Sequence, residues 1–396
     1  MGSVQQALAQ MAVGKAQTRF MLVLFSSLLV IRGKVNFTNL SRYCSFCERS
    51  LRRWFSKPFD FEAFNRHFLE QVNLPGSLQL FAMDASFLPK SGKKTYGLDW
   101  FWNGCLGRTE KGLEISLIAL IDSSAQAAYA LSARQTPARA ATKLSRLELY
   151  LQHLQETRSY LPNSVTCGVC DSYYAKKNFV DGVCDLNLNL ISKLRIDADM
   201  RFLYTGPQKP RGRRRRYGAK VRLDDLSGFE YAGTLANEVQ LYTSLVHHAS
   251  LKRVIRIVVL LNLSNPVKPR QALLFSSDTD LTAQEIVERY SARFQIEFLI
   301  RDAKQFTGLS DCQARNQAAL HFHINASLAA VNLARLEARR NANPDRLFVF
   351  SLASIKHRAF NTHLLDIFID KFDLKPTLIK SHPSYLDLCA YASLAA

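Results

Sequence analysis

The sequence predicts an α/β protein with a helical N-terminal segment, a β-rich insertion and a helical tail. Three observations carry this prediction. Residues 1–75 show helical patterns without strand-like alternation. Strand-like runs and an amphipathic helix fill 76–196, and this α/β pattern resumes over 273–340. Between these two parts, 197–272 offers strand-like runs without helices, and 341–396 again reads as helical.

Composition makes a polyanion the first partner to consider. Lys and Arg total 52 against 33 Asp and Glu, for a formal net charge of +19. Such an excess favours DNA, RNA or an acidic membrane as the partner, with a merely basic housekeeping enzyme as the alternative. The apolar content of 47% lets each of two or three domains bury a core.

The N-terminal segment is expected to be a compact helical unit. Its apolar run FMLVLFSSLLVI (20–31) is shorter than the about 20 residues that span a bilayer, and no small-residue cleavage site follows it. We therefore expect a buried helix there. Two short helices around a turn are expected over 36–59, the second carrying Arg52 and Arg53. Such a basic helix suits contact with a DNA groove or phosphates, and a solvated basic face is an equal alternative.

Eight cysteines include two CxxC pairs, Cys44/Cys47 and Cys167/Cys170. This spacing can indicate a zinc site. The second pair lies in SVTCGVCD, which reads as a strand, where residues three apart point to opposite faces. We therefore expect buried thiols in a reducing cytoplasm.

Three strand-like runs with short connections open the core: SLQLFAMD (77–84), LEISLIALID (113–122) and AYALSARQT (128–136). They are followed by an amphipathic helix over 143–161, the strand SVTCGVCD (164–171) and the strand LNLISKLRI (188–196). Three meandering strands, a helix and a fourth strand is the order of the ribonuclease-H-like fold. The sequence therefore predicts a ribonuclease-H-like core, although strand order alone is weakly specific.

The β-rich insertion is the most cationic part of the chain. From Lys193 to Arg222 there are eleven Lys and Arg against two Asp. The loop QKPRGRRRRYGAKVR (208–222) supplies the expected phosphate contacts, Arg213, Arg214, Arg215 and Arg216. A disordered, solvated loop is the alternative, and it is compatible with phosphate binding.

A capping-box pattern at Thr282 and Glu285 predicts the start of a helix that continues through RYSARFQIEFLIRDAK (289–304). At 100° per residue, five residues share a face about 80° wide: Tyr290, Arg293, Glu297, Arg301 and Lys304. Apolar residues cover the other sides: Phe294, Ile296, Phe298, Leu299 and Ile300. We expect the helix to lie against a core with its charged stripe facing a cleft. An ion-pair ladder is the alternative, and would contribute only tenths of a kcal/mol.

Glu297 is the single acid of this stripe, so its partners are expected elsewhere. Asp84 closes the first predicted strand and Asp171 the fourth. These strands are neighbours in a ribonuclease-H-like sheet, so their carboxylates can meet across one edge; Asp122, also at a strand end, is the runner-up. Shared carboxylates can hold two divalent metals about 4 Å apart, and flanking cations neutralise phosphates. The pattern predicts metal-dependent phosphodiester chemistry.

The spacing Tyr290-x2-Arg293-x3-Glu297-x6-Lys304 matches the Y-(2)-R-(3)-E-(6)-K signature, so the chain resembles DDE transposases of the insertion-sequence-four type. The resemblance covers about residues 30–340. It includes MDASFLPKSGKKTYGLDWFWNGC (83–105), CDSYYAKKNF (170–179) and LSDCQAR (309–315).

The resemblance implies an acidic triad, Asp84, Asp171 and Glu297, that binds two Mg²⁺ or Mn²⁺ ions. It implies that the motif's Tyr, Arg and Lys contact transposon-end DNA near the cleaved bond. The expected activity is cleavage at the terminal inverted repeats of the element and joining of the 3′-OH ends to target DNA, by cut and paste. The expected partners are double-stranded DNA and a second copy in a synaptic homodimer, with no membrane or small-molecule substrate. The expected location is the bacterial cytoplasm, at the nucleoid.

The sequence departs from better-known members of that family in two places. Ala85 and Ser86 follow the first Asp, where those members have Asp-Thr. The insertion also lacks the tryptophan that stacks on a flipped base during hairpin formation, and nothing selects a substitute among Tyr217, Phe229, Tyr231 and Tyr242. A non-cleaving DNA-binding regulator derived from a transposase and a ribonuclease-H-like structure-specific nuclease stay open as alternatives.

Overall fold

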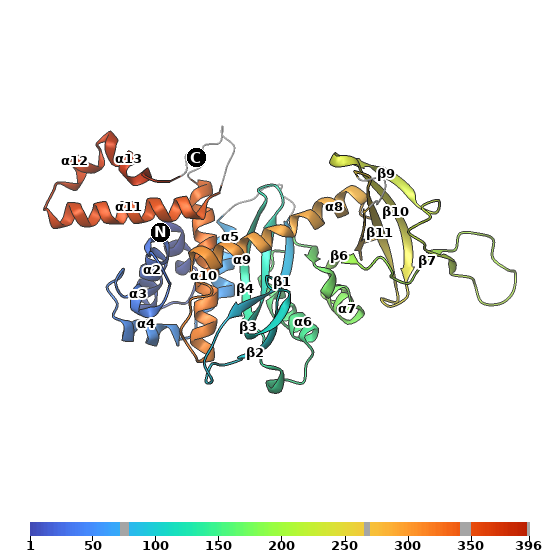
Figure 1. The fold of residues 1–396 in the computed structure, drawn as a ribbon, viewed down its shortest axis with the longest axis horizontal. Coiled ribbons are helices and arrows are strands. Elements are labelled where there is room, and N and C mark those ends of the chain that lie inside the picture. Colours follow the sequence, from blue (N-terminus) through green and yellow to red (C-terminus); the bar gives the residue numbers. More distant parts are fainter. Residues whose placement is uncertain (72–78, 265–269, 341–349, 394–396) are drawn as a thin grey trace.

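The structure is a computed structural model that describes residues 1–71, 79–264, 270–340 and 350–393. The molecule is elongated, with the N-terminal and C-terminal helices at one end and a β-rich lobe at the other (Figure 1). The predicted boundaries at 75/76 and 340/341 lie outside the described residues. In the ranges that are described, no helix combines the length and apolarity needed to cross a bilayer.

Helices make up the described N-terminal residues, as predicted: α1 (Gly2–Ala9), α2 (Lys15–Val30), α3 (Phe37–Leu40), α4 (Glu48–Phe55) and α5 (Phe61–Glu70). The apolar run 20–31 lies in α2 and joins the main core. Phe20 of α2 stacks on Trp54 of α4 with 5.0 Å between ring centroids. Aromatic packing of this kind fixes the basic face of α4 outward.

The core strands are β1 (Gln79–Pro89), β2 (Asp99–Asn103), β3 (Arg108–Asp122), β4 (Ala127–Gln135), β5 (Cys167–Cys170) and β6 (Asn189–Leu194). Strand β2 was not predicted from the sequence, and β1 was predicted to end too early. Asp84 lies within β1, because residues 85–89 go on pairing with β3 after the apolar run ends. Two helices, α6 (Arg146–Thr157) and α7 (Lys177–Asp185), pack on one face of this sheet.

The predicted insertion contains β7 (Met200–Leu203), β8 (Tyr217–Lys220), β9 (Glu230–Leu235), β10 (Val239–His248), β11 (Arg253–Asn262) and the start of β12 (Arg270–Ser276). The described strands form one sheet in the order β2-β3-β1-β5-β6-β12-β11-β10-β7-β8, with β4 on β3 and β9 on β10. Among these described strands, only the pairs β1–β5 and β5–β6 are parallel. The predicted boundary at 272/273 falls inside β12, which joins the core strand β6 to the insertion strand β11.

The last part of the chain is helical: α8 (Ala283–Ala292), α9 (Phe294–Phe306), α10 (Gln317–Arg340), α11 (Leu352–Lys371), α12 (Pro376–Lys380) and α13 (Pro383–Ala390). The capping box at Thr282 and Glu285 is confirmed. The single helix predicted after it is interrupted at Arg293, whose N–H donates to the Tyr290 carbonyl three residues back. A tight turn of this kind interrupts the α-helical ladder between α8 and α9.

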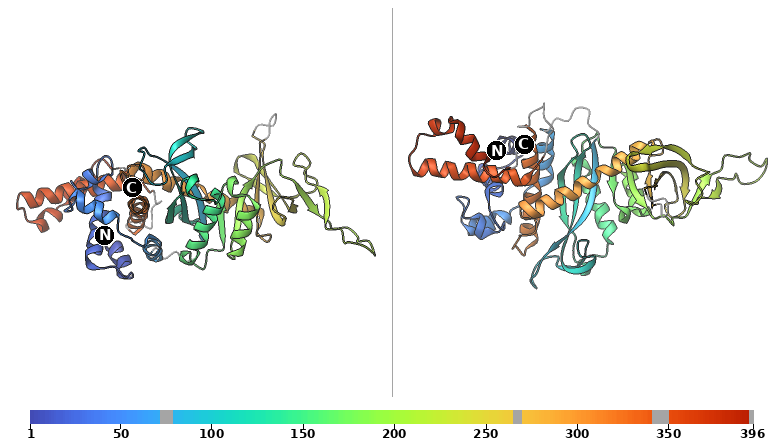
Figure 2. Two further views of the ribbon diagram at one scale, coloured as in Figure 1. Left: turned by 90° about the horizontal axis from the view of Figure 1, so that it is seen from below. Right: turned by 45° about the horizontal axis from the view of Figure 1, so that its top comes forward.

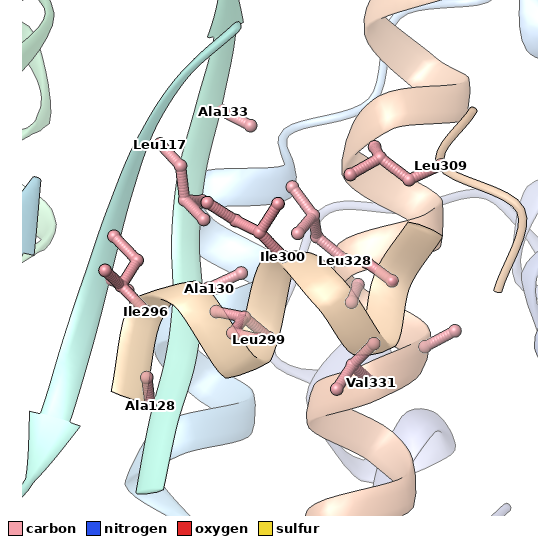
Figure 3. Close-up of a cluster of buried hydrophobic side chains, with 14 of the residues drawn as sticks. Leu117, Ala128, Ala130, Ala133, Ile296, Leu299, Ile300, Leu309, Leu328 and Val331 are labelled. Atoms are coloured by element: carbon pink, nitrogen blue, oxygen red, sulfur yellow. The ribbon is translucent and has the colours of Figure 1, made fainter. Parts of the chain in front are cut away.

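Helix α9 packs its inner face against β3, β4 and α10 (Figure 3). Ile296, Leu299 and Ile300 are buried there. The expectation that Phe294 and Phe298 are also buried is wrong, because they are 49% and 42% exposed. The buried stripe of α9 is therefore narrower than the sequence suggested, and Phe294 and Phe298 face outward.

Gly168 sets the contact between the two strands that carry the aspartates. It pairs with Phe81 across the parallel β1–β5 ladder, and a Cβ at Gly168 would lie 2.0 Å from an atom of the Phe81 ring. We expect Gly168→Ala to lower the free energy of unfolding by about 1–3 kcal/mol through overpacking. Chemical denaturation measures this loss. Gly218→Ala is the matched control, since its nearest neighbours lie at 3.5 Å, and an equal loss there would contradict the account.

Candidate active site

Two aspartates lie side by side on neighbouring parallel strands. The β1–β5 register pairs Met83 with Cys170, so Asp84 is the next residue of β1 and Asp171 is the first residue after β5. Asp171 directly follows the last residue of β5, close to the strand end that was predicted for it, and its Oδ1 accepts a hydrogen bond from the Tyr173 N–H at 2.9 Å. The structure therefore brings the two predicted carboxylates together.

The electrostatics of this pair show a third carboxylate nearby. Burial, together with the negative charges of Asp171 and Glu297, raises the pKa of Asp84 to about 7, while Arg293 opposes the shift. Burial also raises the pKa of Asp171, with Glu297 adding to the effect. Three acidic groups thus repel one another around a nearby guanidinium, and such a cluster favours a bound cation.

Arg293 is the counter-ion of this cluster. The residue is 8% exposed and its Nη1 lies 2.9 Å from Oε1 of Glu297. The guanidinium also lies 5.7 Å from the ring centre of Tyr290, whose pKa is raised by burial and by the charge of Asp171. The break between α8 and α9 therefore places the first three motif residues around the aspartates.

Lys304 anchors the other end of α9 beside the same cluster. Its Nζ donates to the Phe87 carbonyl of β1 at 2.9 Å. Burial lowers the pKa of Lys304, and the charge of Asp84 opposes that shift. All four residues of the Tyr-Arg-Glu-Lys spacing thus gather around the two aspartates.

Arg301 and Asp122 do not join this group. Arg301 pairs with its neighbour Asp302 at 3.1 Å, and Asp302 pairs with Arg335 of α10 at 3.2 Å, so Arg301 turns toward α10. Asp122 is fully buried at the far end of β3 and pairs with Arg339 at 2.8 Å. The prediction that five residues share one face is therefore confirmed for the four residues of the Tyr-Arg-Glu-Lys spacing and is wrong for Arg301.

A basic groove of ≈790 Å³ runs between the N-terminal helices and the end of β1. Four cations line it, Lys34, Arg52, Lys90 and Arg315. Arg52 also pairs with Glu48 at 2.6 Å, whereas Arg53 is exposed and does not line the groove. Lys34, Lys90 and Arg315 were not predicted from the sequence, because three distant segments supply them.

The four consecutive arginines occupy the loop between β7 and β8. All four, Arg213 to Arg216, are exposed, and none forms an ion pair within the described parts of the chain. The Arg215 guanidinium lies 4.4 Å from the Tyr204 ring centre. This loop projects at the end of the molecule opposite the helical domain, so it is a separate cationic surface (Figure 2).

The CxxC prediction holds for one pair only. Cys167 and Cys170 are buried in two different core clusters, which confirms that they face opposite sides of the sheet. Cys44 is partly buried, and Cys47 is exposed at the start of α4, so the expected burial of Cys47 is wrong.

The carboxylates suit a hard divalent cation by their chemistry. An all-oxygen, multiply charged donor set is the preference of Mg²⁺ and Mn²⁺. Among the described residues, no three His, Cys, Asp or Glu side chains already stand close enough to hold a metal. Arg293 already pairs with Oε1 of Glu297, so a metal at this oxygen would have to displace the guanidinium. The carboxylate oxygens therefore fit Mg²⁺ or Mn²⁺ by their chemistry, and these ions would compete with Arg293 for Glu297.

Fold and site together define an α/β protein with a carboxylate cluster in basic surroundings. Residues 10–244 match the family model described as DDE superfamily endonuclease. Because this match covers more than half of the chain, the protein belongs to that family. The matched range includes Asp84 and Asp171 and ends before Glu297.

The chain has low similarity to a solved transposase structure. This structure is the cryo-EM structure of the piggyBac transposase synaptic complex with hairpin DNA, with a TM-score of 0.45 and 12% sequence identity. The similarity covers 99% of this chain and 81% of that one. No curated protein matches the chain.

Proposed function

We propose that the protein is a DDE transposase of the insertion-sequence-four type, which cleaves DNA at the ends of its own element and joins them to target DNA. The observation that carries this proposal is the pair Asp84 and Asp171 on adjacent parallel strands, with Glu297 beside them. The strand order β4-β3-β1-β5-β6 supports a ribonuclease-H-like core. The family assignment supports the endonuclease step.

The three carboxylates would hold two Mg²⁺ ions, which supply Lewis-acid activation of the attacking oxygen and stabilise the leaving oxygen. Water attacks the phosphorus at the element's end, breaks the P–O3′ bond and leaves a 3′-OH on the element. That 3′-OH then attacks a target phosphodiester and releases a target 3′-OH. No covalent bond between protein and DNA forms.

Arg293 and Lys304 hold the DNA in this scheme. Arg293 is buried and paired with Glu297 in the free protein, so opening this pair frees a guanidinium for a phosphate of the bound strand. Lys304 is fixed by the Phe87 carbonyl and presents a second positive charge near Asp84. When the scissile bond reaches the carboxylates, the neighbouring phosphates of the strand therefore lie next to both cations.

A plasmid that carries the DNA flanking the coding region on both sides tests this function. Incubation with the protein and Mg²⁺ should excise the segment between inverted repeats and join its ends to a second plasmid. Cleavage that ignores the repeats would favour the structure-specific nuclease. Binding without any cleavage would favour the non-cleaving regulator.

The arginine loop is expected to add sequence-independent affinity for DNA. Replacing Arg213 to Arg216 by serine should reduce the magnitude of the negative slope of log K against log[salt] by up to about 0.9 for each phosphate that the loop no longer neutralises. Fluorescence anisotropy at several salt concentrations measures the slope. Arg195→Ser and Arg222→Ser are matched controls, because these exposed arginines are already paired with Asp197 and Asp224. An unchanged slope in the fourfold variant would reject the loop as a DNA contact.

We also propose a homodimer, because joining two ends needs two active centres and the described residues contain one carboxylate cluster. Helices α11 to α13 offer a surface for the second copy (Figure 2). Their exposed apolar residues are Leu364, Ile367, Phe368, Phe372, Leu378, Ile379, Leu386, Leu388 and Tyr391. An apolar surface of this extent on a projecting helical hairpin indicates a protein contact.

Phe368→Glu combined with Phe372→Glu should weaken dimerisation by about 100-fold, since each loses the burial of an aromatic side chain. Light scattering of the protein bound to end DNA measures the mass of the complex. Ile196→Glu is the matched control, because Ile196 is 63% exposed but lies outside α11 to α13. A complex of unchanged mass in the double variant would place the dimer contact elsewhere.

A further inference from the structure

Two tryptophans are exposed on one face of an edge strand. Trp100 and Trp102 of β2 are 61% and 57% exposed, whereas Phe101 between them is buried on the opposite face. Among the described strands, β2 pairs only with β3. Indole rings bury large apolar areas when they find a partner, so two of them side by side on an open face indicate a binding surface.

This face is the one that carries Asp84. Asp84 lies opposite Leu117 in the β1–β3 ladder, and Trp100 lies opposite Lys111 in the β2–β3 ladder. Opposed residues of an antiparallel pair point to the same side, and Lys111 and Leu117 are an even number of residues apart on β3. The tryptophans and the carboxylate therefore share one side of the sheet.

Lys304 neighbours both the carboxylates and the tryptophan hairpin. The Phe87 carbonyl that accepts its hydrogen bond belongs to a residue that lines a groove of ≈440 Å³ together with Trp100. The turn after β2 also brings Cys105 within electrostatic range of Lys304, as Asp84 is. A strand that passes the carboxylates and Lys304 would therefore reach the tryptophans next.

The surroundings of the two indoles are cationic. Lys111 and Arg108 line the same groove, and Lys93 and Lys94 are exposed in the loop before β2. The acid that lines this groove, Glu110, is paired with Arg108 at 2.7 Å. Exposed aromatic faces beside positive charges are the combination that binds nucleic-acid strands with unpaired bases, by stacking and by phosphate contact.

We propose that Trp100 and Trp102 form a stacking platform for unpaired bases of the DNA strand that leaves the carboxylate cluster. The proposal rests on the proposed function, because cleavage and joining create strand ends beside the carboxylates. Stacking does not depend on base identity, so the platform adds affinity for unpaired DNA without sequence preference. Charge complementarity selects DNA over a protein partner as the occupant.

Tryptophan fluorescence tests the platform directly, because the chain has three tryptophans. Trp54→Phe leaves Trp100 and Trp102 as the emitting residues and keeps an aromatic ring against Phe20. Without divalent cations, an oligothymidylate of about 16 nucleotides should quench this emission. Heparin, a polyanion without bases, should bind and leave the emission nearly unchanged. Equal quenching by heparin would overturn the proposal.

A pair of variants separates stacking from simple charge. Alanine at both Trp100 and Trp102 should weaken oligothymidylate binding about tenfold or more, with heparin binding unchanged, whereas phenylalanine at both positions should retain most of the affinity. Unchanged affinity of the alanine variant for oligothymidylate would overturn the platform. That result is the one expected if the two tryptophans formed a protein-docking surface. These measurements need no cleavage. If the protein fails to join DNA ends but its tryptophans still stack on bases, the proposed function is rejected and the platform stands. If it joins DNA ends but the tryptophans do not stack on bases, the platform is rejected and the proposed function stands.

Discussion

Glu297→Gln is expected to lower Mg²⁺-dependent DNA cleavage by about 10³-fold or more, the equivalent of several kcal/mol of lost transition-state stabilisation. The amide keeps the size of the side chain and removes the charge that a divalent cation would use. Affinity for end DNA should be retained, because the substitution removes negative charge near the phosphates. Gel-based cleavage and anisotropy measure the two quantities on the same DNA.

Glu288→Gln is the matched control for this variant. Glu288 lies on α8, nine residues before Glu297, and its side chain is exposed. Its substitution should leave both cleavage and binding unchanged. Cleavage that persists in Glu297→Gln would remove this residue from the site, and a parallel loss in Glu288→Gln would point to a general effect of acidic residues on the helix pair.

Asp84→Asn is expected to abolish cleavage to a similar degree and to make the metal-free protein more stable. Burial and the charges of Asp171 and Glu297 raise the pKa of Asp84 to about 7, so its ionised form is unfavourable in the folded protein. The neutral amide removes this repulsion. In EDTA at pH 8, where the wild-type carboxyl is mostly ionised, the melting temperature should rise by about 2 °C or more.

Added Mg²⁺ should make the wild type melt at a higher temperature than the Asp84→Asn variant. A cation that binds the folded carboxylate cluster stabilises the wild type by mass action, by about 2.7 kcal/mol at a concentration one hundred times its dissociation constant. Mg²⁺ should stabilise the Asp84→Asn variant much less. Equal Mg²⁺-induced shifts in both proteins would show that the ions bind elsewhere, and this result does not depend on any activity assay.

Local patterns predicted the elements that carry the site. The capping box at Thr282 and Glu285 marked the start of α8, and the recurrent strand order predicted that Asp84 and Asp171 are neighbours. Both depend on interactions close in sequence or on a common arrangement of strands. The end of β1 was missed because its last residues are held by pairing with β3, which the local apolar pattern does not encode.

The orientation of Arg301 shows what a helical projection leaves out. The projection treats 289–304 as one straight helix, but the chain turns at Arg293 and begins α9 anew. Arg301 then lies beside Asp302, which is held by Arg335 of a different helix. Contacts between distant segments decide such orientations, and the same reason hid the groove cations Lys34 and Lys90.

The most direct test of the carboxylate site is nicking of a supercoiled plasmid by the wild-type protein, with Mg²⁺ and with EDTA, beside the Asp84→Asn, Asp171→Asn and Glu297→Gln variants. A metal-dependent site at these carboxylates predicts Mg²⁺-dependent cleavage by the wild type, loss of that cleavage in EDTA and loss in each of the three variants. Cleavage that survives EDTA, or that survives all three substitutions, would contradict a metal-dependent site at these carboxylates.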